Sequence, residues 1–171
     1  IKVMVSKPDF DPNQISSVIE ETANSDSSCL LNRATQGMYP PGSTFKILTT
    51  LEYIRENPNY KSYSYECEGE GIFNSVSIHC YNHKVHGTVD LEQSLAYSCN
   101  TSFSNIGTKL DMDALNKLCE DFLYNKELPY DGYYYKSSYS LTSKTDKSLI
   151  PQTVIGQGKT LITPLHNAMI M

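Results

Sequence analysis

Ser43 and Lys46 have residue types and a spacing suited to acyl transfer. They stand three residues apart at the predicted start of a helix, directly after the rigid break Tyr39–Gly42, so their side chains share one helical face. A serine hydroxyl becomes a strong nucleophile when a neighbouring base takes its proton, and a lysine is such a base only when neutral. Burial and the positive end of a helix both disfavour the ammonium form. The pair therefore predicts a serine nucleophile with a lysine base.

The bare Ser-x-x-Lys pattern is weak evidence, because chance matches are common and a solvated surface lysine is the ordinary explanation. Ser43–Lys46 is, however, the only match in the chain, and it falls at a helix start. There the Ser43 backbone N–H would face an oxyanion formed during acyl transfer. The position thus supports the acyl-transfer interpretation.

A second segment, Ser98-Cys99-Asn100, offers a hydroxyl that can relay a proton and an amide that can hold both Lys46 and a substrate carbonyl. By itself a Ser-x-Asn triplet is better explained as a helix N-cap. It gains weight only in combination with Ser43 and Lys46.

The elements that must position these residues follow from periodicity and caps. A strand is expected at Ile1–Val5, a short amphipathic helix at Ile15–Thr22 and a surface loop at Asn24–Ser28. The clearest helix runs from Ser43 to Glu56, and a long loop with room for a hairpin covers Tyr60–Gly87.

Further helices are expected in the second half of the chain. Asp90 and Gln93 form a capping box for a helix that ends near Tyr97. A helix at Thr101–Leu110 follows, and then one capped by Asp111. Thr163 and Pro164 are expected to start a last helix, which continues to Met171 without a C-cap. At the other end, apolar residues alternate with other residues from Ile1 onward, as in a strand. These two features predict that the chain is a fragment cut at both ends.

The composition sets limits on function. The 171 residues suit one domain, and 39% hydrophobic residues can build a core. The net charge of −5, with 14 basic against 19 acidic residues, argues against nucleic acid as a partner. No apolar stretch approaches the length of a membrane-spanning helix.

Several longer phrases, in this order, closely resemble the transpeptidase domain of class B penicillin-binding proteins. They are Ser6–Asn13 (SKPDFDPN), Asn32–Lys46 (NRATQGMYPPGSTFK), His86-Gly87, Ser98–Phe103 (SCNTSF), Gly156-Gln157-Gly158 and Thr163-Pro164-Leu165. The resemblance implies an α+β transpeptidase fold. It further implies that residues 1–171 are part of that domain, mostly its helical part, lacking most strands of the central sheet.

The resemblance also implies a mechanism on the D-Ala-D-Ala end of peptidoglycan stem peptides. Ser43 would attack the penultimate D-Ala carbonyl with Lys46 as base, Ser98 would carry the proton toward the leaving D-Ala, and Asn100 would orient Lys46 and the peptide. A second stem peptide would resolve the acyl-enzyme, and β-lactams would trap Ser43. No cofactor or metal is expected.

One family motif is missing. No Lys-Thr/Ser-Gly triplet occurs in the sequence, since Gly158-Lys159-Thr160 is followed by Leu161 and matches a different family phrase. It is not a phosphate loop either, because Thr153 stands where that motif needs glycine. The isolated chain is therefore expected to have weak or no activity.

Five cysteines are present, with four histidines. The group Cys67, His79, Cys80, His83 and His86 has ligand types suited to zinc, but its spacing matches no knuckle. Because the resembled family works outside the cytoplasm, a Cys67–Cys80 disulfide is the favoured interpretation, though not settled. Cys99 is expected to be a small buried filler pointing away from the site, and His86 to be structural.

The resemblance implies stem peptides, β-lactams and cell-wall synthesis proteins as partners, on the outer face of a bacterial membrane, with the parent anchored by an N-terminal helix absent here. Alternatives remain. A class D β-lactamase shares the Ser43–Lys46 phrase but generally carries an aliphatic residue where Asn100 stands. A β-lactam sensor or a catalytically silent scaffold of the same fold is the other alternative.

Overall fold

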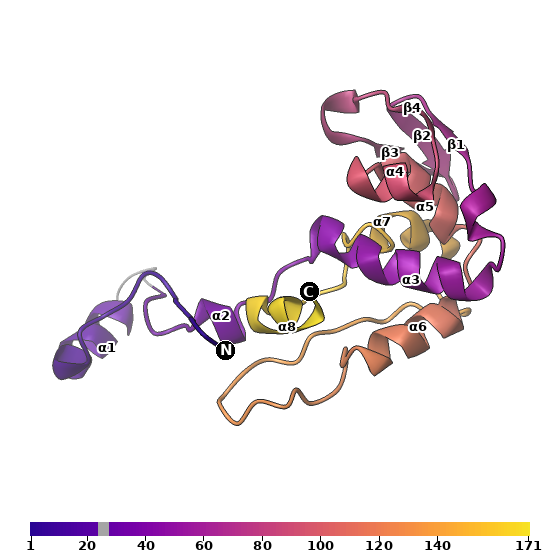
Figure 1. Cartoon of the computed structure of the whole chain (residues 1–171). Coiled ribbons are helices and arrows are strands. Elements are labelled where there is room, and N and C mark those ends of the chain that lie inside the picture. Colours follow the sequence, from indigo (N-terminus) through magenta and orange to yellow (C-terminus); the bar gives the residue numbers. More distant parts are fainter. Residues whose placement is uncertain (24–27) are drawn as a thin grey trace.

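The computed structural model describes residues 1–23 and 28–171, and helices make up most of the regular secondary structure in this part of the chain (Figure 1). The α-helices are α1 (Ile15–Ala23), α2 (Arg33–Gln36), α3 (Lys46–Glu56), α4 (Leu91–Ala96), α5 (Asn100–Gly107), α6 (Met112–Asp121), α7 (Ile150–Thr153) and α8 (Pro164–Ile170). Short 3-10 turns lie at Pro12–Gln14, Gly42–Phe45, Tyr60–Ser62, Tyr81–His83 and Lys147–Leu149. None of the helices in the described part is long and apolar enough to cross a bilayer.

Strands in the described residues are short and form two antiparallel pairs. β1 (Tyr65–Cys67) pairs with β4 (Gly87–Val89), and β2 (Glu70–Phe73) pairs with β3 (Val76–His79). The β2–β3 hairpin turns at Asn74 and Ser75, which have φ of 48° and 66°, as a two-residue hairpin turn requires. The expected long loop thus contains a hairpin, and the expected mostly helical fold with little sheet is confirmed.

The expected strand at Ile1–Val5 is wrong: residues 1–10 contain no strand or helix. Ile1, Val3 and Val5 are 78%, 79% and 68% exposed. Apolar residues do alternate with other residues in this segment, but a strand needs a neighbouring strand for its backbone hydrogen bonds. Within the described residues, no strand pairs with this segment.

Most expected helices occur close to their predicted bounds. The capping box of Asp90 and Gln93 forms at α4, Asp111 caps α6, and the Thr163 hydroxyl accepts from the His166 N–H at the start of α8. The helix expected at Thr101–Leu110 begins one residue earlier and ends at Gly107. Of the expected loop Asn24–Ser28, residues 24–27 lie outside the described residues.

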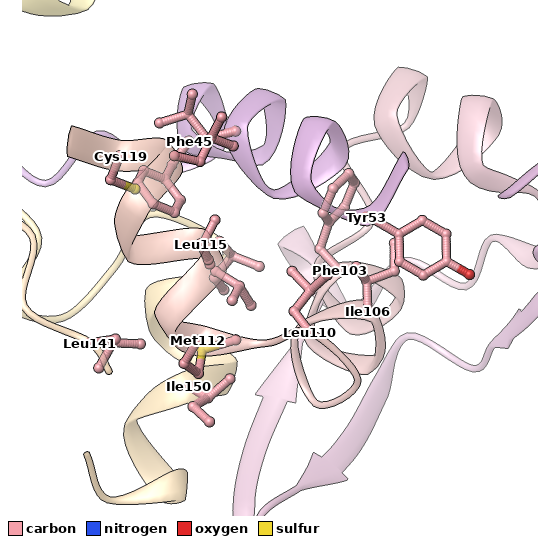
Figure 2. Packing of buried hydrophobic residues seen from close by; sticks show 14 of the residues in the cluster. Phe45, Tyr53, Phe103, Ile106, Leu110, Met112, Leu115, Cys119, Leu141 and Ile150 are labelled. Atoms are coloured by element: carbon pink, nitrogen blue, oxygen red, sulfur yellow. The ribbon is translucent and has the colours of Figure 1, made fainter. Parts of the chain in front are cut away.

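The hydrophobic core lies where α3, α5, α6 and α7 meet (Figure 2). Tyr53 of α3, Phe103 of α5 and Leu115 of α6 are buried there. Phe45, two residues after Ser43, stacks on Tyr139 with ring centroids 5.6 Å apart. Burial of Phe45 therefore fixes the turn that carries Ser43 and starts α3.

Candidate active site

The 3-10 turn Gly42–Phe45 leads directly into α3, so Ser43 and Lys46 occupy consecutive turns on one face. Ser43 is exposed, whereas Lys46 is 0% exposed. An accessible hydroxyl beside a buried amine is the arrangement that nucleophile and base require.

The backbone before Ser43 is held by a contact from the far end of the sequence. The Gly42 N–H donates to the Gly156 carbonyl over 2.8 Å. Gly156 has φ of +75°, and a Cβ at this position would lie 2.0 Å from the Gly42 carbonyl oxygen. Only glycine fits such a close approach. The Gly156-Gln157-Gly158 phrase therefore supports the Ser43 turn.

Lys46 Nζ lies at the centre of a hydrogen-bond network. It donates to the Ser98 carbonyl at 2.7 Å, to Asn100 Oδ1 at 2.7 Å and to Ser98 Oγ at 2.8 Å, and it lies 3.3 Å from Ser43 Oγ. The Ser98 hydroxyl in turn donates to Ser43 Oγ at 2.8 Å. The structure thus brings together the four residues singled out in the sequence.

The Ser98-Cys99-Asn100 loop is held in an unusual conformation. Ser98 has φ of 52°, which is uncommon for a residue with a side chain. Asn100 begins α5, and its Nδ2 donates to the His79 carbonyl at 3.0 Å. This bond leaves Oδ1 directed at Lys46.

Burial sets the electrostatics of the site. Burial lowers the pKa of Lys46 to about 8, against the opposing effect of the Cys99 and Cys80 thiols. The ammonium also lies 5.5 Å from the centre of the Phe103 ring. Because of its burial, Lys46 can therefore lose its proton near neutral pH.

The four oxygen neighbours of Lys46 suit a neutral amine, which has two N–H groups and one lone pair. Two of these atoms, the Ser98 carbonyl and Asn100 Oδ1, can only accept, while the two hydroxyls can also donate. The amine can give its hydrogens to the former and accept from a hydroxyl. The geometry thus permits proton transfer from Ser43 to Lys46 directly or through Ser98.

A thiol-imidazole cluster, which we define as Cys67, Cys80, Cys99 and His86, lies behind this loop. All four ligand atoms lie within 4.8 Å of one another. Cys67 and Cys80 are free thiols with sulfurs 3.8 Å apart, so the disulfide favoured in the sequence is not formed. Cys99 is buried, as expected, but its sulfur joins the cluster. Sequence reasoning left Cys99 out of this group, and no local pattern in the sequence places it there.

The other two histidines of the sequence group lie outside this cluster. His79 and His83 stack on each other with ring centroids 4.8 Å apart, and His83 Nδ1 lies 3.3 Å from a Glu70 carboxylate oxygen. Lys159 is exposed.

Comparison with known proteins places this geometry in a family. The whole chain, residues 1–171, matches the family model of the penicillin binding protein transpeptidase domain. The peptidoglycan D,D-transpeptidase PbpA of Mycolicibacterium smegmatis is 28% identical over 99% of this chain. MrdA of Acinetobacter baumannii, also named a peptidoglycan D,D-transpeptidase, is 26% identical over 99% of it.

A solved structure agrees. Penicillin-binding protein A of Mycobacterium tuberculosis, as an imipenem acyl-enzyme complex, superposes with a TM-score of 0.88 and 26% identity over 98% of this chain. The chain spans 37% of the PbpA sequence from M. smegmatis, 28% of MrdA and 41% of the chain in that structure. The chain belongs to the penicillin-binding protein transpeptidase family, in its class B branch.

Proposed function

We propose that Ser43 is the acylated residue of a peptidoglycan D,D-transpeptidase that takes D-Ala-D-Ala stem peptides and β-lactams. The observation that carries the proposal is the contact set around Lys46. Its buried amine reaches Ser43 Oγ, Ser98 Oγ and Asn100 Oδ1 in one network. The family supplies the substrate class, since the relatives are named peptidoglycan D,D-transpeptidases.

In the proposed reaction, Ser43 Oγ bonds to the penultimate D-Ala carbonyl carbon while its proton passes to neutral Lys46. The tetrahedral intermediate then expels D-Ala as its C–N bond breaks, and Ser98 delivers a proton from Lys46 to the leaving amine. The amine of a second stem peptide then bonds to the acyl carbon as the bond from that carbon to Ser43 Oγ breaks, and the proton that the amine loses returns to Ser43 Oγ through Lys46. With a β-lactam the leaving nitrogen stays tethered, so the acyl-enzyme persists.

Asn100 has a positioning role in this reaction. Its Nδ2 is fixed by the His79 carbonyl and its Oδ1 by Lys46. The amide therefore holds the lysine without adding a charge that would favour the ammonium form.

We further propose that the 171 residues alone acylate slowly. They contain no Lys-Thr/Ser-Gly triplet, the motif whose family role is to bind the substrate carboxylate and complete the oxyanion hole. Loss of one oxyanion donor costs about 100- to 1000-fold in other acyl-transfer enzymes. A longer form of the protein that includes the motif should react faster.

The test is intact-mass spectrometry after incubation with a penicillin. The expected result is one adduct on the longer form, little on the 171-residue chain, and none after Ser43→Ala. Lys46→Ala should abolish the adduct, while Lys159→Ala, an exposed lysine in the Gly158-Lys159-Thr160 segment, should leave it unchanged.

The lifetime of the adduct separates the rival functions. A long-lived adduct with turnover of a D-Ala-D-Ala peptide supports the transpeptidase. A long-lived adduct without peptide turnover indicates a β-lactam sensor, and rapid hydrolysis of the penicillin indicates a β-lactamase. No adduct on either form would leave a silent scaffold and contradict the proposal.

We also propose that the protein acts outside the cytoplasmic membrane, with an anchor in the parent protein, together with cell-wall synthesis proteins. The support is by analogy: the penicillin-binding protein PBP2 of Helicobacter pylori has been solved in complex with MreC. That structure is 19% identical to this chain. Co-purification of the longer form with cell-wall synthesis proteins from membranes tests the assignment.

A further inference from the structure

Two buried serines lie on either side of the loop that carries Ser98. Ser94 of α4 stands four residues before Ser98, and Ser102 of α5 stands four residues after it. Both side chains are 0% exposed, and their hydroxyl oxygens are 2.7 Å apart. This contact, which we call the serine bridge, therefore joins the two ends of the segment at whose centre Ser98 stands.

The neighbouring groups determine the direction of each hydrogen bond at the serine bridge. Ser94 Oγ lies 2.6 Å from the Asp90 carbonyl, which can only accept, so the Ser94 hydroxyl hydrogen is used there. Ser102 must therefore donate to Ser94. Because this uses the Ser102 hydrogen, Tyr63 Oη, 2.9 Å from Ser102 Oγ, donates to Ser102. Tyr63 Oη in turn accepts from Asn105 Nδ2 at 3.2 Å. The hydrogen bonds thus run in one direction, from Asn105 to the Asp90 carbonyl.

This series of hydrogen bonds exceeds what packing of α4 against α5 requires. Replacing both partners of a buried hydrogen bond with apolar groups can be nearly neutral for stability. A buried polar network in which each hydroxyl has its partner instead makes the structure rigid and specifies one arrangement. The neighbouring feature that needs one arrangement is the Ser98–Asn100 loop.

The loop between the two serines has a conformation that its own residues do not favour. Ser98 has φ of 52°, and such conformations persist only where the surrounding structure over-determines them. The Ser98 and Cys99 N–H groups donate back to the Leu95 and Ser94 carbonyls, at 3.0 and 2.9 Å. Both of these bonds join the loop to α4. The serine bridge adds a link from Ser102, on the far side of the loop, to the same helix.

We propose that Ser102 is a positioning residue for acylation, which acts through Ser94 to hold the Ser98–Asn100 loop against Lys46. The loop supplies three of the four oxygen neighbours of Lys46 Nζ. It also supplies the hydroxyl that donates to Ser43 Oγ. Movement of the loop therefore alters the path of the proton. This role in acylation rests on the proposed function, whereas the effect of the serine bridge on the loop does not.

The first test compares two buried serines of α5 in the longer form of the protein that includes the Lys-Thr/Ser-Gly motif. Ser102→Ala removes the donor to Ser94. Ser104→Ala is the matched control, because Ser104 is also 0% exposed and its hydroxyl donates to the Pro151 carbonyl at 3.0 Å, away from the loop. At saturating penicillin, Ser102→Ala should lower the acylation rate by about tenfold or more, and Ser104→Ala should leave it unchanged. Equal rates in the two variants would overturn the positioning role.

A second measurement follows the loop without acylation. Hydrogen exchange of the Ser98 and Cys99 amides, resolved by NMR, reports local opening of the loop. Both amides should exchange at least about tenfold faster in Ser102→Ala than in Ser104→Ala. The amides of α6, which lie outside the serine bridge, serve as the internal reference for global stability. Equal exchange at Ser98 and Cys99 in the two variants, relative to α6, would show that the serine bridge does not hold the loop.

A third variant removes the same hydrogen bond from the other helix. Ser94→Ala should lower the acylation rate to a similar extent, and it tests the proposal even where Ser102→Ala folds poorly. The double variant should acylate no more slowly than the slower single variant, because one hydrogen bond can be lost only once. A rate that falls by the product of the two single effects would contradict a shared bond.

The positioning role and the proposed function fail separately. If the unaltered longer form gives no penicillin adduct, the acyl-serine function is wrong, and hydrogen exchange still decides whether the serine bridge holds the loop. If the adduct forms and Ser102→Ala acylates as fast as Ser104→Ala, the positioning role is wrong and the function stands.

Discussion

Asn100 Oδ1 accepts a hydrogen bond from Lys46 Nζ at 2.7 Å, across 54 positions of sequence. The other end of the same amide is tied to the His79 carbonyl. A fixed, uncharged acceptor satisfies the buried amine without the charge of a carboxylate. Lys46 therefore keeps a low pKa while remaining hydrogen-bonded.

The first prediction is that Lys46 titrates near neutral pH. Burial lowers its pKa to about 8, so roughly one molecule in ten carries neutral Lys46 at pH 7 and most do at pH 9. The acylation rate should accordingly rise about tenfold between pH 7 and pH 9. Carbon NMR of the lysine ε-carbons, with Lys46→Arg for assignment, reads the same titration without acylation. An acylation rate that is flat over this range would contradict Lys46 as base.

The second prediction concerns Asn100→Asp. A carboxylate at hydrogen-bond distance favours the ammonium, so the pKa of Lys46 should rise by about one to three units. The pH profile of acylation should move upward by the same amount, and the rate at pH 7 should fall at least about tenfold. Asn59→Asp, the same change at an exposed position, serves as control. An unshifted profile in Asn100→Asp would show that the amide does not govern Lys46.

Much of the site could be predicted from the sequence because its determinants are local. Ser43 and Lys46 are one helical turn apart, and their shared face follows from helix geometry. The caps at Asp90, Asp111 and Thr163 are also local signals, and the structure forms all three. Ser98 and Asn100 were predicted through the resemblance and not through their spacing.

What could not be predicted depends on contacts between distant segments. No local pattern reveals that Cys99 meets Cys67 and Cys80, because the three lie directly before α5, at the end of β1 and directly after β3. The Ile1–Val5 alternation failed for a related reason. A strand forms only where a partner lies beside it, and periodicity carries no information about partners.

The third prediction tests the close approach beneath Ser43. Gly156→Ala would place Cβ 2.0 Å from the Gly42 carbonyl oxygen at φ of +75°, so the backbone before Ser43 must move. We expect a loss of about 1–3 kcal/mol in the free energy of unfolding and slower acylation. Chemical denaturation and adduct formation measure the two effects.

Gly158→Ala is the matched control for that substitution. Gly158 has φ of +76°, but its nearest neighbour would lie 3.7 Å from the new Cβ. Gly158→Ala therefore introduces the backbone strain of a positive φ, about 1–2 kcal/mol, without a steric clash of the new Cβ. Equal effects on acylation in the two variants would show that the Gly42–Gly156 contact does not position Ser43.

The fourth prediction concerns stability at low pH and centres on His166. This side chain is buried. Its Nε2 donates to the Phe122 carbonyl, because a carbonyl can only accept. In the neutral ring Nδ1 therefore accepts from the Ser137 hydroxyl. Burial lowers the pKa of His166 below its ordinary value of 6.5. Below about pH 6.5 the unfolded chain therefore binds a proton that the folded chain resists, and the free energy of unfolding falls as the pH drops.

Replacing the imidazole should remove that contribution. His166→Gln should be less stable at pH 7.5 by about 1–3 kcal/mol, through the lost hydrogen bonds, and should lose less of its remaining stability between pH 7.5 and pH 5. Carboxylates that titrate in the same range act equally in both proteins, so the difference between the two curves isolates His166. His79→Gln, at an exposed histidine, serves as the control. Identical slopes for His166→Gln and the unaltered chain, measured by thermal unfolding at each pH, would show that His166 is not the group that sets this dependence.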